Sequence, residues 1–170
     1  MFLAPTPTLN GTVRPLKSGK AGVFQTLKVM RQLVNAARLD PQLRQVATSA
    51  VFLKPQKDEL AEVTTLFNLV QSQIRYTGDV NNVETLQTPQ ITLASRIGDC
   101  DDMTSLLCTL FECIGYPTRF VVAGYGGSLD FSHVYAQVFA AGDWIDCDAT
   151  EPYPIGWAGP NPSVIFYEAV

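Results

Sequence analysis

Apolar residues recur every three or four positions in three stretches of the first half of the chain. The spacing predicts an amphipathic helix over residues 22–39, which Pro41 would end, and a second helix over residues 41–52. A third helix is expected over residues 58–74, with a buried stripe formed by Leu60, Val63, Leu66, Phe67, Val70 and Ile74. These helices are expected to pack together, and they carry no candidate chemistry.

A long polar stretch lies between Tyr76 and Gly98. We expect it to be an ordered loop, and such loops often belong to binding sites. Helical spacing returns after it, in an apolar stripe formed by Met103, Leu106, Leu107, Leu110 and Ile114. Gly115 and Pro117 predict the end of this helix.

In the second half of the chain the pattern of apolar residues becomes typical of β-strands. Residues 118–123 are β-branched and aromatic, and a glycine-rich loop over residues 124–132 follows them. Residues 133–139 and 144–150 are expected to form a hairpin. The tail, residues 151–170, is rich in proline and irregular until a final apolar segment, and it is expected to wrap the domain.

These elements predict an α+β fold in which helices pack on an antiparallel β-sheet. A chain of 170 residues fits one domain with its own core. Within it we expect an extended arm (1–20), a helical part (21–75), a core that carries the candidate chemistry (76–150) and the wrapping tail (151–170).

Composition and charge limit the partners. Hydrophobic residues make up 46% and charged residues 16% of the chain, as in a compact folded protein. The net charge of −4 gives no broad positive field, so nucleic acid is not an expected partner. The sequence contains no membrane-spanning apolar run and no signal-peptide pattern, and its four cysteines form no CxxC pair. We therefore expect a cytoplasmic protein without disulfides and without a membrane partner.

Cys100 has the surroundings that a nucleophilic thiol needs. Gly98, Asp99 and Cys100 end the polar stretch and open the helix, with Asp99 as the expected N-cap. The sulfur would then lie at a helix N-terminus, where the dipole favours the thiolate. The carboxylates of Asp99, Asp101 and Asp102 oppose this effect, so a basic partner is required. For Asp102, at the capping-box position, a capping role and a functional role both stay open.

The single histidine of the chain, His133, is the candidate base. It starts a strand directly after the glycine-rich loop, where a side chain can face a cleft. If Phe139 pairs with Trp144 across the turn, His133 and Asp148 become diagonal neighbours on one face of the hairpin, roughly 5 to 8 Å apart. A carboxylate at that distance can orient the imidazole. Asp146 is a rival for this role, but this register places it further from the histidine.

The same register places only apolar residues on the opposite face of the hairpin, namely Val134, Ala136, Val138, Ile145, Cys147 and Ala149. Cys147 is therefore expected to act as a small core residue. Cys108 and Cys113 fall within or at the end of the predicted helix, so neither competes with Cys100 as a nucleophile. A metal site built on Cys100 and His133 is disfavoured, because zinc sites recruit several Cys or His at short spacing.

Three segments together resemble the core of the transglutaminase-like superfamily: GDCDDMTSLLCTLFECIGYPTRFVVAG, SHVYAQV and WIDCDAT. The resemblance covers residues 58–150. It implies a papain-like fold with Cys100 as nucleophile, His133 as base and Asp148 as orienter, and no cofactor. The run ETLQTPQITLASRIGDCDD further resembles phage and prophage members, which would imply an association with virions.

The resemblance also implies a donor for the oxyanion besides the cysteine N–H. Gln87, Gln90 and Tyr76 are the candidates, and an upstream glutamine in papain-like peptidases favours the first two; an ordinary loop hydrogen bond is the alternative for each. The cleft is expected between the helix start and the sheet, lined by the two long loops. Asp99, Tyr135 and Trp157 are its further candidate residues.

The implied reaction is acyl transfer on an amide bond of a peptide or protein. Hydrolysis is the favoured outcome, as in a cysteine peptidase or amidase. Capture of the acyl group by an amine, as in a transglutaminase, and a non-catalytic virion-associated binding module are the alternatives. The sequence makes no prediction of the oligomeric state.

Overall fold

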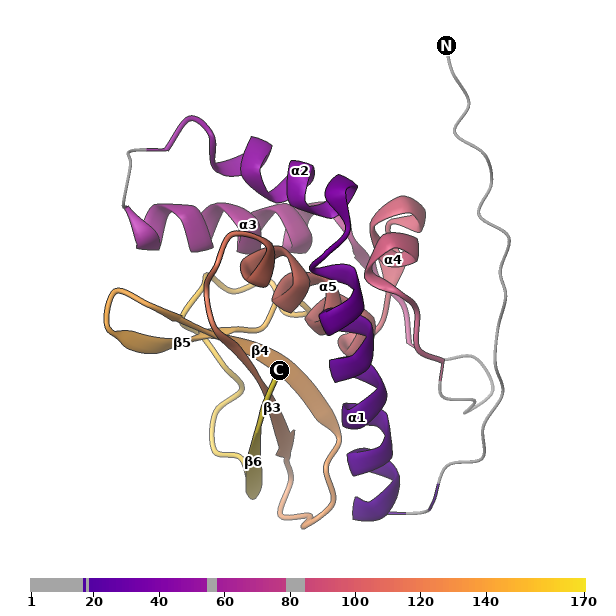
Figure 1. Cartoon of the computed structure of the whole chain (residues 1–170). Coiled ribbons are helices and arrows are strands. Elements are labelled where there is room, and N and C mark those ends of the chain that lie inside the picture. Colours follow the sequence, from indigo (N-terminus) through magenta and orange to yellow (C-terminus); the bar gives the residue numbers. More distant parts are fainter. Residues whose placement is uncertain (1–16, 18, 55–57, 79–84) are drawn as a thin grey trace.

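The computed structural model describes residue 17 and residues 19–54, 58–78 and 85–170. The extended arm expected over residues 1–20 lies almost wholly outside these described residues. The helices are α1 (Lys20–Ala37), α2 (Pro41–Val51), α3 (Glu59–Gln73), α4 (Pro89–Ser95) and α5 (Cys100–Cys113) (Figure 1). The strands are β1 (Arg75–Tyr76), β2 (Ile97–Gly98), β3 (Thr118–Gly124), β4 (His133–Ala140), β5 (Asp143–Cys147) and β6 (Val164–Ala169).

Helix α5 lies at the centre of the fold. It packs against α1, α2, α3 and α4 on one side and against β3 and β4 on the other (Figure 1). All of its residues except Cys100 and Glu112 are buried. A helix enclosed on all sides is held in one position by packing around its whole circumference. The position of Cys100, its first residue, is fixed in the same way.

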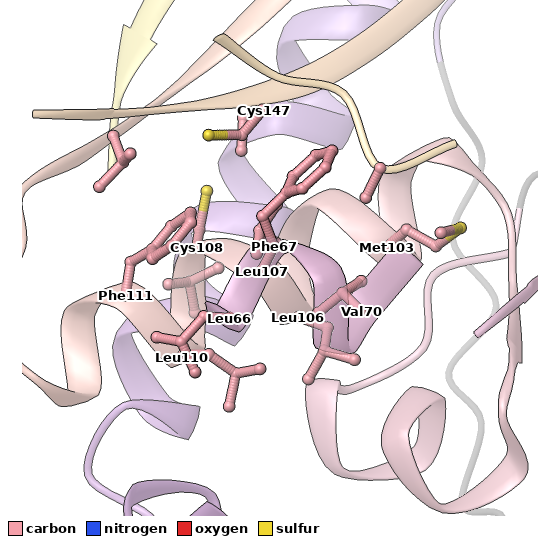
Figure 2. Packing of buried hydrophobic residues seen from close by; sticks show 14 of the residues in the cluster. Leu66, Phe67, Val70, Met103, Leu106, Leu107, Cys108, Leu110, Phe111 and Cys147 are labelled. Carbon is pink, nitrogen blue, oxygen red and sulfur yellow. The ribbon is translucent and has the colours of Figure 1, made fainter. Parts of the chain in front are cut away.

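The core joins α3 and α5 to the sheet. Phe67 and Leu66 of α3 pack with Leu107 and Phe111 of α5, and Cys147 at the end of β5 covers the same cluster (Figure 2). Cys147 is 1% exposed, so the prediction that it faces the core is confirmed. The apolar face of the hairpin therefore supports the helix that carries Cys100.

The large sheet has the order β5-β4-β3-β6 with antiparallel pairing throughout. Phe139 pairs with Trp144, which confirms the register expected for the hairpin. The two turn residues, Ala141 and Gly142, both have positive φ (53° and 85°), as a tight two-residue hairpin turn requires. Strand β5 ends at Cys147 rather than at residue 150, so Asp148 lies just beyond it.

One expectation of irregular structure was wrong. The stretch expected to be a loop between residues 77 and 97 contains α4 and β2. Its start signals are present, because Thr88 accepts a hydrogen bond from the backbone N–H of Ile91 and Pro89 follows in the first turn. The final apolar segment of the tail forms a strand, β6, which pairs with β3.

None of the helices in the described ranges has the length and apolar character needed to cross a bilayer.

Candidate active site

Cys100 is the first residue of α5, and the local sequence fixes it there. The side chain of Asp99 caps the helix by accepting a hydrogen bond from the backbone N–H of Asp102 at 3.1 Å. Gly98 leaves no room for a side chain, since a Cβ atom there would lie 2.8 Å from the Cβ of Asp102. The N-cap expected from the sequence is confirmed.

The carboxylate of Asp102 anchors the preceding segment. Its oxygens accept hydrogen bonds from the backbone N–H of Gln87 at 2.7 Å and from the Nε2 of Gln87 at 2.6 Å. Asp102 is 2% exposed, so these bonds satisfy buried carboxylate oxygens. Its side chain therefore joins the chain before α4 to the start of α5, a structural role that neither reading of the sequence described.

His133 and Asp148 meet at the other side of the site. His133 is the first residue of β4, and its Nε2 lies 2.8 Å from Oδ2 of Asp148. The other oxygen, Oδ1, accepts bonds from the backbone N–H of Thr150 at 3.2 Å and from its hydroxyl at 2.6 Å. Both oxygens of this buried carboxylate are thus held. Because Nε2 is engaged, Nδ1 is the ring nitrogen available for exchanging a proton with a thiol.

Asp146, the rival orienter, is occupied elsewhere. Its Oδ1 accepts a hydrogen bond from the Nε2 of Gln137 at 2.5 Å, and Gln137 in turn accepts from the Nε of Arg119 at 2.6 Å. The preference for Asp148 thus agrees with the geometry, because the carboxylate in contact with His133 is that of Asp148.

A cavity of about 360 Å³ brings the two sides together. Cys100 and His133 both line it, with Tyr76, Asp99 and Asp101 beside them. Tyr76 reaches this place because β1 pairs with β2, which sets it opposite Gly98. The structure therefore places the candidate nucleophile and the candidate base on the walls of one cavity.

The thiol of Cys100 does not ionise easily by itself. Burial is the main cause that raises its pKa above the ordinary range, and the charges of Asp101 and Asp99 raise it further. Backbone hydrogen bonds from Val134 and Asp101 act in the opposite direction but do not compensate. The sulfur also lies 3.8 Å from Oδ1 of Asp101. A thiolate in this position requires a positive group such as a protonated His133 next to it.

The two glutamines suggested as oxyanion donors do not line this cavity. The amide of Gln87 donates to Asp102 and, at 3.2 Å, to the backbone oxygen of Ile97. The Nε2 of Gln90 donates to Oδ2 of Asp40 at 2.9 Å and thereby lowers the pKa of that carboxyl. Both amides hold the segment around α4 in place, so the expectation for them is corrected. Tyr76 is the remaining candidate in contact with the cavity.

Tyr135 and Trp157 also lie away from the cavity. Tyr135 is 4% exposed and stacks behind His133 with 6.1 Å between ring centroids, in a small cluster with Val121. Trp157 stacks on Tyr153 at 4.1 Å. Tyr135 therefore supports the imidazole from behind, and of the three suggested cleft residues Asp99 alone lines the cavity.

One wall of the cavity was not predicted from the sequence. It is formed by α1, through Val23, Leu27 and Met30. The apolar spacing of α1 predicted a buried face, but spacing does not distinguish a face that packs from one that lines a cavity. Among the residues that the structure describes, no three His, Cys, Asp or Glu side chains gather as a metal site would require.

Several solved structures share the fold of this chain. A candidate cysteine protease from Cytophaga hutchinsonii superposes with a TM-score of 0.55 at 14% identity, covering 76% of this chain and 50% of that one. A candidate protease from Parabacteroides distasonis gives a TM-score of 0.61 at 13% identity, with 76% and 26% covered. A structure of Rad4–Rad23 crosslinked to undamaged DNA gives 0.54 at 13% identity, with 78% and 38% covered.

The chain thus spans half or less of the length of these proteins, and identities this low show a shared fold alone. The comparison with curated proteins gives no significant match. The sequence profile described as the transglutaminase-like superfamily matches residues 46–149, which is more than half of the chain. The chain therefore belongs to the transglutaminase-like superfamily, with the mixed helical and antiparallel-sheet fold expected from its sequence.

Proposed function

We propose that this protein is a cysteine-dependent enzyme that hydrolyses an amide bond in a peptide or protein. Cys100 is the nucleophile, His133 the base and Asp148 the orienter. The observation that carries the proposal is the 2.8 Å contact between His133 and a buried Asp148, at the edge of the cavity that Cys100 also lines. A base held by a carboxylate at the cavity that also holds a thiol supports covalent catalysis, which uses a nucleophile, a base and an orienting group.

The reaction would proceed in two steps. The proton of the Cys100 thiol passes to Nδ1 of His133, and the sulfur forms a bond to the amide carbonyl carbon. The carbon–nitrogen bond then breaks, and the leaving amine takes the proton from the imidazolium. In the second step a water gives a proton to His133 and its oxygen attacks the thioester, which releases the carboxylic acid and restores the thiol.

The oxyanion of each tetrahedral intermediate needs preorganised donors. The backbone N–H of Cys100 lies at the start of α5, where N–H groups have no partner within the helix. The hydroxyl of Tyr76 is our candidate for the second donor because Tyr76 lines the cavity.

Hydrolysis is preferred to amine capture because a transglutaminase must keep water out of its site. Tyr76 is 52% exposed, and the side chain of His133 is 20% exposed, so water reaches both sides of the cavity. The likeness to candidate proteases supports the same choice at the level of fold. The cytoplasmic location, the association with virions and the lack of a nucleic-acid partner stay predictions.

A peptide screen by mass spectrometry in H₂¹⁸O tests the proposal. Wild type should generate new carboxyl termini that carry one ¹⁸O, and Cys100→Ala should generate none. If an added primary amine is instead incorporated with release of ammonia, the enzyme is a transglutaminase. If the wild type yields no product and its Cys100 is alkylated no faster than an ordinary thiol, the protein is a binding module and not an enzyme.

A further inference from the structure

The cavity beside Cys100 has two chemically different walls. The reacting groups and the carboxylates of Asp99 and Asp101 form one of them. The other is apolar and formed by Val23, Leu27, Met30, Val122, Phe131 and Val134. Met30 is fully buried, and Leu27, Val122 and Val134 are each 3% exposed, so this wall closes the bottom of the cavity.

The apolar wall is held firmly in place. Helix α1 contacts β6 through an edge-on pair of Phe24 and Phe166, with 5.1 Å between ring centroids, and through an ion pair of Arg31 and Glu168 at 3.1 Å. Its residues precede the range 46–149 that matches the superfamily. The part of the wall that α1 forms therefore lies outside the matched core, whereas Val122, Phe131 and Val134 lie within it.

The volume of the cavity and the charges that line it limit which substrate side chains can bind there. A volume of about 360 Å³ is near the lower end for ligand pockets, about 300–1,000 Å³, and suits one or two residues of a peptide. An apolar side chain in contact with the partly buried Val23 and Phe131 would leave water, which favours binding. An acidic side chain would lose its hydration and meet the like charges of Asp99 and Asp101. Lys17 also lines the cavity, but it is exposed, so solvent screens its positive charge. The same cavity therefore favours a neutral apolar group and disfavours an anionic one.

We infer that the residue on the acyl side of the cleaved bond has a neutral aliphatic side chain, which binds between α1 and the start of β4, and that Val23 is a specificity-determining residue. This inference rests on the proposed acyl transfer at Cys100. Val23 is the suitable position to alter, because it is only partly buried and lies on the cavity side of α1.

The experiment compares peptidyl fluoromethyl ketones that are identical except for leucine, glycine or aspartate next to the reactive group. Labelling of Cys100 is followed by intact-protein mass spectrometry. We expect the leucine probe to label wild type about tenfold or more faster than the glycine probe, and the aspartate probe to be slowest. Val23→Phe should lower the ratio of the leucine rate to the glycine rate to about one, because the larger ring fills the space that the leucine side chain would occupy. The matched control is Val46→Phe, in α2 at a partly buried position away from this cavity, which should keep the wild-type preference.

Equal rates for the three probes in wild type would overturn the inference without any variant, and so would a Val23→Phe change that slows leucine and glycine probes alike. Iodoacetamide separates this failure from that of the proposed function. If iodoacetamide labels Cys100 in a manner that requires His133, acyl-transfer chemistry stands although the aliphatic preference fails. If that labelling does not depend on His133, both are overturned.

Discussion

The two sides of the candidate site are built from different structural elements and experience negative charge in opposite ways. Cys100 begins an enclosed helix and has Asp99 and Asp101 next to it, which raise the pKa of its thiol. His133 begins a strand and has the carboxylate of Asp148 in contact with its ring. Negative charge opposes a thiolate and stabilises an imidazolium. In the proposed mechanism the thiol side therefore depends on the imidazole side to accept its proton.

The largest expected effect comes from removing the base, which leaves the thiol side without the imidazole side. We expect His133→Ala to lower turnover about 10⁴-fold, because the buried thiol then has neither a proton acceptor nor a positive neighbour. The rate of Cys100 alkylation should rise only above the pH at which an ordinary thiol ionises, about 8.5. Stopped reactions analysed by peptide mapping between pH 6 and 10 measure this. If the pH profile of alkylation were the same in the variant and in wild type, the thiol side would not depend on the imidazole side.

Removing the orienter weakens the imidazole side without deleting it. Asp148→Ala should lower turnover by about 10²-fold, less than loss of the base itself, because the ring keeps its position on β4 but loses its hydrogen-bonding partner. Asp146→Asn is the control, since this carboxylate binds Gln137, and its rate should stay within about twofold of wild type. Similar losses in both variants would show that the charge of the region matters rather than the single contact.

On the thiol side, reducing the negative charge should increase reactivity. In a His133→Ala background, Asp101→Asn should lower the pKa of Cys100 and speed its alkylation at pH 8 by about threefold to tenfold. The exposed Asp130, in the loop before β4, provides the control in Asp130→Asn, which should leave the rate unchanged. A slower reaction in Asp101→Asn would mean that this carboxylate assists the thiol.

The smallest effect on catalysis is expected outside both sides. Gln90→Ala should leave the alkylation rate within about twofold of wild type and lower the free energy of unfolding by about 0.5–1 kcal/mol, a small value because Asp40 is only partly buried. Folding lowers the pKa of Asp40 below 3.8, so its contribution is present above that pH and is lost as the pH falls below it. Denaturant unfolding at pH 7 and pH 3 measures the difference. A large loss of catalysis would restore Gln90 as an oxyanion candidate.

The imidazole side could be predicted in detail from the sequence because it is local. One tight turn fixes the pairing of Phe139 with Trp144, and the pairing then carries His133 to within reach of Asp148. The cap of α5 was equally accessible, since Asp99 and the helix that it caps are adjacent in the chain. In both cases a few neighbouring residues determine the geometry.

The rest of the site depends on packing between distant segments. Gln90 meets Asp40 across 50 positions, and no local pattern indicates that partner. Tyr135 was expected to line the cleft, yet Ala158 of the tail packs against the small cluster that contains it. Gly159 approaches Tyr125 so closely that a Cβ atom would lie 2.6 Å from the hydroxyl. These contacts arise from the shape of the folded chain rather than from periodicity.

The hairpin of β4 and β5 also bears on how the molecule assembles. His133 and Asp148 are 15 positions apart, whereas the bond from the Thr104 hydroxyl of α5 to the Val134 oxygen of β4 spans 30. Hairpins close in about 1–10 μs, and contacts of higher sequence separation form later because a longer loop loses more entropy. During folding the base and its carboxylate should therefore meet before the nucleophile joins them, so that thiol reactivity develops last.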